Sequence, residues 1–116
     1  MKHVHYDEVQ DAPVEVEGAK DARIRWLIDD TDGALNFCMR RFDLAAGGHT
    51  PTHVHAWEHE IYFLEGEGSL QTTDGPAAFR PGDVVYVAPF EQHGIAADRG
   101  VDVAFLCLIP NSGKHA

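Results

Sequence analysis

Residues 47–68 of the chain read GGHTPTHVHAWEHEIYFLEGEG, and this stretch decides both the expected fold and the expected site. It carries His53, His55 and His59, with Glu60 directly after them. Residues two apart in an extended strand point to the same face, so His53 and His55 can direct two imidazoles toward one point. Because neutral imidazole is the commonest metal ligand among side chains, the stretch predicts part of a site for a divalent transition metal.

Such a site needs a further ligand from elsewhere in the chain. Residues 81–93 read PGDVVYVAPFEQH, in which a turn and a short apolar run lead to a second proline and then to His93. Considered alone, a histidine in this position would be an ordinary loop residue. Together with the first stretch, it becomes the candidate for the distant ligand.

The two stretches resemble the two motifs of the cupin superfamily. The resemblance implies an all-β fold, the double-sheet jelly-roll barrel of the cupins, in a single domain. It also implies one divalent transition metal per chain. The matching positions are Gly47, His53, His55 and Gly66 for the first motif and Pro81 to His93 for the second.

The position that is usually acidic in the first motif has two candidates. Counting back from Gly66 leads to His59, whereas counting forward from His55 leads to Glu60. In an unbroken strand His59 lies on the face of His53 and His55 and Glu60 lies on the opposite face, but a turn between them would reverse this. We predict His59 as the ligand and keep Glu60 as the alternative, with a role as hydrogen-bond partner of an imidazole if it does not bind the metal.

The chain also resembles the small single-domain manganese cupins, whose site consists of four histidines. This resemblance implies His53, His55, His59 and His93 as the ligands and manganese as the metal. Iron, zinc, nickel and copper stay open, because a site of four nitrogens would prefer copper or nickel over manganese in free competition. Ala97 stands where the family often has an asparagine, so the substrate side of the pocket departs from the family pattern.

The rest of the chain reads as short strands separated by turns rich in Gly, Pro and Asp, of which residues 74–76 are one. Many short strands at near-regular spacing are typical of an all-β sandwich or barrel, in agreement with the resemblance. The expected strands are 23–28, 35–44, 60–64, 69–73, 83–88, 94–97 and 101–109.

Residues 21–116 are expected to form one cupin barrel, because the chain is too short for two hydrophobic cores. Residues 1–20, which are rich in Asp, Glu and Val, are treated as a separate N-terminal segment. In similar small cupins an N-terminal strand often crosses to a partner subunit. The resemblance therefore implies a homodimer in which this segment is an exchanged strand.

The formal charge of −10 comes from 19 acidic against 9 basic residues, which argues against nucleic acid or an anionic membrane as a partner. The N-terminus has no apolar run of signal-peptide length, and no run elsewhere is long enough to span a membrane. Cys38 and Cys107 lie far apart in the sequence, so a disulfide is not expected. We therefore predict a soluble cytoplasmic protein whose partner is a small-molecule substrate or ligand.

Apolar side chains on two expected strands are candidates for the pocket around the metal. Phe37 and Met39 alternate along one strand, and Phe105 and Cys107 alternate along the last strand. An apolar pocket with few polar groups is typical of a small-molecule site. Each of these residues could equally be an ordinary core residue.

Several polar side chains near the motifs could take part in catalysis. Glu60, Tyr62 and His49 are the candidates for a general base, although no pattern singles one of them out. Arg40 and Arg41 must face opposite ways in a strand. One of them could point inward and meet a carboxylate, or it could be an exposed partner of an acidic residue.

Cupins include dioxygenases, isomerases, decarboxylases, dehydratases and binding domains, and a fold does not choose among these activities. A metal held by three or four side chains keeps coordination positions open for water, dioxygen or a chelating substrate. We predict a metal-dependent oxidoreductase of dioxygenase type that acts on a small oxygen-containing molecule. The alternatives are a non-catalytic module that binds a small molecule, and a non-redox isomerase or lyase that uses the metal as a Lewis acid.

Overall fold

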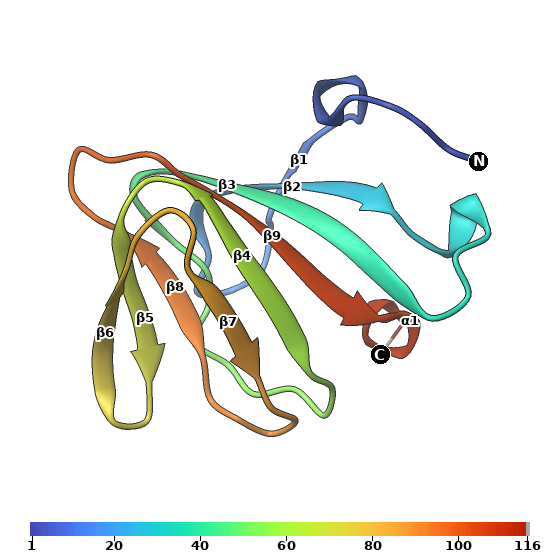
Figure 1. Ribbon diagram of the computed structural model, residues 1–116. Helices are drawn as coiled ribbons and strands as arrows, with labels where there is room; N and C mark the ends of the chain where they lie inside the picture. The colour runs from blue at the N-terminus through green and yellow to red at the C-terminus, as the bar shows by residue number, and fades with distance from the viewer. Residues whose placement is uncertain (116) are drawn as a thin grey trace.

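The computed structural model describes residues 1–115, which consist almost entirely of strands and turns (Figure 1). The expectation of an all-β fold is therefore confirmed. No helix within these residues is long and apolar enough to cross a membrane. The strands are β1 (Ala12–Pro13), β2 (Lys20–Ile28), β3 (Phe37–His49), β4 (His59–Glu65), β5 (Gly68–Thr72), β6 (Gly75–Phe79), β7 (Val84–Val87), β8 (Gly94–Ala97) and β9 (Val103–Pro110). The short helices are η1 (Tyr6–Glu8), η2 (Asp30–Asp32) and α1 (Asn111–Lys114).

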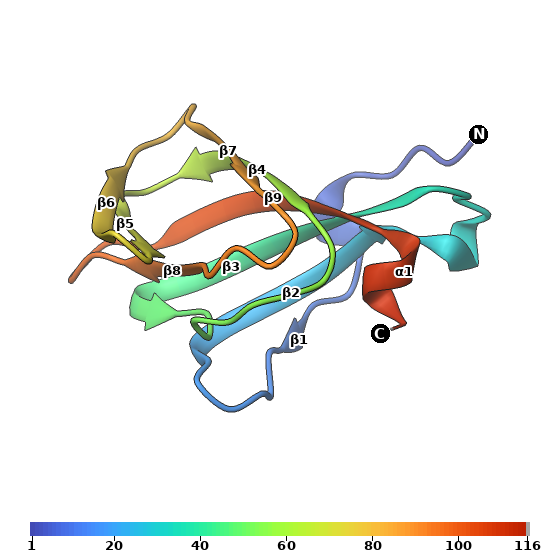
Figure 2. The same cartoon turned by 90° about the horizontal axis from the view of Figure 1, so that it is seen from below.

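All strands belong to one antiparallel sheet that is built around the long strand β3. β3 pairs with β9 on one side and with β2 on the other, and its last residue, His49, pairs with Ala96 of β8. The strand order is β6-β5-β8-β3-β9-β4-β7, with β2 and then β1 joined to β3 on the side away from β9. The sheet curls into a half-barrel, so that β4 and β7 lie across the interior from β3 and β2 (Figure 2).

Aromatic side chains fill the interior of this half-barrel. Phe63 stacks on Phe79 with 3.9 Å between the ring centroids and lies 5.5 Å from Phe105, which stacks on Phe42 of β3 at 5.1 Å. Burying one such ring fully stabilises the folded state by roughly 1.5–3 kcal/mol. Buried residues alternate along β4 from Phe63 back to His59. The hydrophobic core therefore continues directly into the histidine site.

Each strand expected from the sequence overlaps an observed strand, but β1 and β6 are not among the expected strands. β6 begins at Gly75, inside the segment that reads as a turn, and it includes Pro76. Proline is tolerated in this strand because β6 lies at the edge of the sheet, where a missing N–H need not break the ladder. β3 also runs five residues further than expected, to His49 rather than residue 44.

The N-terminal segment packs against the sheet of its own chain. β1 pairs with β2, and the guanidinium carbon of Arg41 lies 4.0 Å from the centre of the Tyr6 ring. Arg41 is only 7% exposed and binds the carboxylate of Asp43 at 3.1 Å. Exchange of this segment with a partner subunit stays a prediction, because the structure describes a single chain.

Two glycines of the first motif have left-handed backbone conformations but different surroundings. Gly47 has a φ of 75° and Gly66 has a φ of 80°. A Cβ atom on Gly47 would meet no atom within 4 Å, whereas a Cβ atom on Gly66 would lie 2.0 Å from the carbonyl oxygen of Asp102. Gly66 is therefore required both by its backbone conformation and by the close approach of the loop that precedes β9.

We expect Gly66→Ala to destabilise the protein more than Gly47→Ala. Both variants carry the left-handed penalty of about 1–2 kcal/mol. Only Gly66→Ala also forces the Asp102 backbone away, which adds about 1–3 kcal/mol. Urea unfolding followed by circular dichroism measures both free energies, and equal midpoints for the two variants would contradict the close contact.

Candidate metal centre

Two backbone hydrogen bonds bring the two sequence motifs together. The N–H of His53 donates to the carbonyl oxygen of His93 at 2.9 Å, and the N–H of His93 donates to the carbonyl oxygen of His53 at 3.0 Å. This exchange of both bonds is that of a hydrogen-bonded antiparallel pair, whose side chains lie on one face. Residues that are distant in the sequence are therefore direct neighbours in the site.

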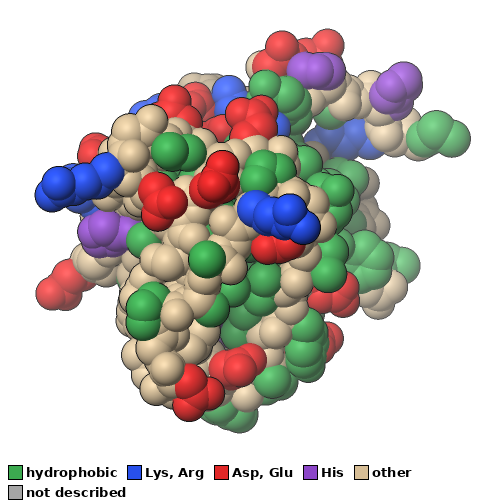
Figure 3. All heavy atoms as spheres, turned by 60° about the vertical axis from the view of Figure 1, so that its left-hand side comes forward, with side chains coloured by type: hydrophobic (Ala, Val, Ile, Leu, Met, Phe, Trp, Pro, Cys, Tyr) green, Lys and Arg blue, Asp and Glu red, His purple; other side chains and the backbone are tan. Residues whose placement is uncertain are grey.

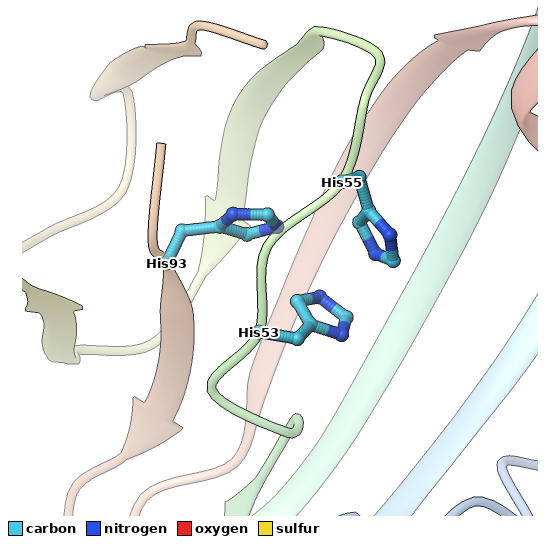
Figure 4. A group of neighbouring side chains, drawn as sticks. All are labelled: His53, His55 and His93. Carbon is cyan, nitrogen blue, oxygen red and sulfur yellow. The ribbon is translucent and has the colours of Figure 1, made fainter. Parts of the chain in front are cut away.

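Three of the predicted ligands converge. The ligand nitrogens of His53, His55 and His93 lie within 4.8 Å of one another. Figure 4 shows the ring of His93 extending from the start of β8 toward the rings of His53 and His55. This spacing makes the three side chains a candidate group for binding one metal ion.

The fourth histidine lies beside this group. The ring centroid of His59 is 4.5 Å from that of His93 and 5.3 Å from that of His55. The residue is 5% exposed, and its Nδ1 atom has no hydrogen-bond partner within residues 1–115. A buried polar atom normally has a partner, so a metal ion fits this nitrogen. Binding of the metal by His59 stays a prediction.

Glu60, the alternative ligand, lies on the other face of β4. It pairs across the sheet with Tyr86 and Leu108, is exposed, and lines a groove on the outer side of the barrel. A bend precedes β4, but the alternation of the strand begins with His59 pointing inward. The side chain of Glu60 is therefore directed away from the four histidines.

The surroundings keep His53, His55 and His59 neutral. Burial lowers the pKa of His53 to about 4 and that of His59 to about 3, and it also lowers the pKa of His55. The neighbouring imidazoles and the positive charge of Arg40 lower these pKa values further. A neutral imidazole has a free lone pair, so these side chains are available as metal ligands at pH 7 without loss of a proton.

The four histidines lie on the wall of a cavity of about 180 Å³. Most of the wall is apolar, and no carboxylate from residues 1–115 contributes to it. The N-terminal segment supplies Val14 and Val16, and β3 supplies Arg40. These three residues are not among the site residues predicted from the sequence. The spacing of two residues between Val14 and Val16 is a signal that could have indicated that both valines face the cavity.

Only two of the four predicted pocket residues line this cavity. Phe105 and Cys107 do, whereas Phe37 and Met39 do not. Phe37 is 60% exposed. The correction follows from the alternation along β3, because Arg40 faces the interior and its odd-numbered neighbours therefore face outward.

The three candidates for a general base also lie away from the cavity wall. Glu60 and Tyr62 line the groove on the outer side of β4. His49 ends β3, where its Nδ1 atom lies 3.3 Å from the carbonyl oxygen of Thr50. The titratable side chains that do line the cavity are the four histidines, Arg40 and Cys107.

Comparison with known proteins finds close structural similarity. The polyketide cyclase RemF from Streptomyces resistomycificus superposes with a TM-score of 0.91 and is 38% identical, with 96% of this chain and 80% of that chain covered. A predicted oxalate decarboxylase from Thermotoga maritima superposes with a TM-score of 0.82 and is 25% identical, with 94% of this chain and 98% of that chain covered.

Among curated proteins, a 1-methylthio-D-xylulose 5-phosphate methylsulfurylase from Rhodospirillum rubrum is 27% identical over 71 residues. The match covers 61% of this chain and 46% of that protein, so the chain spans about half the length of this relative. The family model for the cupin domain matches residues 40–109, which are more than half of the chain and include all four histidines. The chain therefore belongs to the cupin family.

Proposed function

We propose that this chain is a metal-dependent enzyme that closes a ring in a substrate with several carbonyl groups. The metal is bound by His53, His55, His59 and His93. The observation that carries the proposal is the convergence of three of these side chains, His53, His55 and His93, on the wall of an apolar cavity, with the ring centroid of His59 4.5 Å from that of His93. The choice of reaction is supported by the 38% identity to a polyketide cyclase over almost the whole chain.

The donor set supports a transition metal. The four side chains offer only nitrogen donors, and no carboxylate lines the cavity. Imidazole suits zinc, iron, copper and nickel, whereas manganese is implied by the resemblance to the all-histidine manganese cupins. The unpartnered Nδ1 atom of His59 supports a fourth ligand in addition to the group of three.

A metal in this site supplies a Lewis acid with open positions that polarises carbonyl oxygens of the substrate. The apolar side chains of Phe42, Ile61 and Phe105 surround the carbon skeleton and exclude water. Ring closure joins the enolised carbon of one ketone to the carbonyl carbon of another and releases water. The reaction therefore consumes no oxidant.

We propose cyclisation instead of the dioxygenase activity predicted from the sequence. Both reactions fit a metal with open positions, so the histidine geometry supports either one. The similarity to a polyketide cyclase favours a non-redox reaction, whereas the non-redox alternative predicted from the sequence is an isomerase or lyase. Dioxygenase chemistry stays a prediction that oxygen consumption can test.

We expect wild-type protein purified without added metal to contain about one transition-metal ion per chain, measured by elemental analysis. His59→Ala should lose most of this metal, because it removes one of four direct ligands. Glu60→Ala should retain it, because the side chain lies on the opposite face of β4. Loss of a residue that only supports a ligand lowers metal affinity by about 10–100-fold. Metal loss in Glu60→Ala but not in His59→Ala would restore the site with three histidines and one glutamate.

Incubation with a linear β-triketone tests the reaction. We expect the metal-loaded protein to form a ring product that is lighter than the substrate by one water, with no uptake of dissolved oxygen. The activity should persist after replacement of the metal by zinc, because a Lewis acid needs no change of oxidation state. Mass spectrometry measures the mass of the product, and an oxygen electrode measures oxygen uptake in the same sample.

A product heavier by two oxygen atoms, formed with oxygen uptake, would instead support the dioxygenase. Binding of the triketone without turnover would favour the non-catalytic module. The metal-free protein is the control for spontaneous ring closure, which linear polyketones undergo in water.

A further inference from the structure

The cavity contains a positive charge that has no acidic partner within the described residues 1–115. Arg40 lines the cavity together with the histidines, and its Nη2 atom donates to the Sγ atom of Cys107 at 2.9 Å. Its Nε atom is buried and has no hydrogen-bond partner within residues 1–115. The guanidinium lies over the rings of Trp26 and Phe42, at 5.5 and 5.0 Å from their centres. These contacts orient the guanidinium without neutralising it.

Arg40 lies on β3, and the other arginines of β3 and of its neighbour β2 are all paired with carboxylates. Arg23 binds Asp11, while Arg25 and Arg41 both bind Asp43. The chain has a net charge of −10, so carboxylates are abundant. Arg40 is half-buried, but its Nε–H group is fully buried, and a buried donor normally has a partner because its removal from water is otherwise costly. The absence of a described carboxylate beside this one guanidinium indicates that its partner is a ligand.

Cys107 does not supply the missing negative charge. Burial raises the pKa of its thiol, and this effect outweighs the opposing effect of Arg40. The thiol is therefore neutral at pH 7, and sulfur is a weak hydrogen-bond acceptor. The cation also contributes to the lowered pKa values of His53, His55 and His59, which places its charge close enough to influence them.

We infer that Arg40 binds a carboxylate of the substrate, so that the substrate class is an apolar carbonyl compound with a carboxylate group. The Nε and Nη2 atoms present two parallel N–H donors, which match the two oxygens of a carboxylate. The carboxylate displaces the thiol of Cys107 from Nη2 and meets the free Nε donor. The carbon skeleton then extends along the apolar wall toward the histidines. This inference names the substrate class of the proposed site and rests on that proposal.

Benzoate and benzamide are suitable probes, because they have nearly the same shape and differ in charge. A cavity of about 150 Å³ accommodates benzene, so a cavity of 180 Å³ can hold either probe. The titration uses the metal-free protein first, since benzoate could otherwise bind the metal directly. We expect wild-type protein to bind benzoate at least about tenfold more tightly than benzamide, because only the carboxylate forms charge-assisted hydrogen bonds.

Arg40→Gln should abolish this preference, and Arg40→Lys should retain part of it. Arg99→Gln, which removes an exposed positive charge, is the matched control and should behave like wild type. The NMR resonance of the Arg40 Nε–H group should shift with benzoate and not with benzamide, which tests the contact without any variant. A purely structural role for Arg40 would lower thermal stability without changing the preference.

Equal affinity of wild-type protein for the two probes, or binding of neither, would overturn the inference. A preference that survives in Arg40→Gln would also overturn it. The outcome is independent of the metal proposal. A chain that binds no metal can still prefer benzoate, and a metal-loaded cyclase without this preference would reject the role of Arg40 alone.

Discussion

The two backbone hydrogen bonds between His53 and His93 are the contact on which the site depends. They join the segment between β3 and β4 to the start of β8, so that two segments from different parts of the chain lie side by side at the site. Their pairing directs both side chains to the same face. The hydrophobic core below, centred on Phe63 and Phe105, keeps the curled sheet in the shape that this pairing requires.

The electrostatics of the cavity oppose those of the rest of the molecule. The chain carries a net charge of −10, yet the cavity wall contains four histidines and an arginine and no carboxylate. Burial keeps the imidazoles of His53 and His59 neutral and therefore ready to bind a metal. The buried Nε–H group of Arg40, which has no hydrogen-bond partner within residues 1–115, costs folding free energy. Such local conflicts with folding rules are typical of functional sites.

Proteins with different named activities share the fold of this chain. A polyketide cyclase and a predicted oxalate decarboxylase share the fold with this chain at TM-scores of 0.91 and 0.82. Fold alone therefore does not select an activity. In this chain the side chains that line the cavity within residues 1–115 combine apolar walls with Arg40 beside the histidines.

The sequence by itself determined the family, the all-β class and the three histidines that meet at the site, His53, His55 and His93. These features depend on local spacing, since His-x-His in an extended segment directs two rings to one side and glycine marks the turns. Tertiary structure decided the rest. Residues 55–59 include a bend, so only the pairing of β4 with β7 and β9 shows that His59 faces inward and Glu60 outward. Likewise, the interior face of β3 depends on its partners, which is why Arg40 rather than Phe37 reaches the cavity.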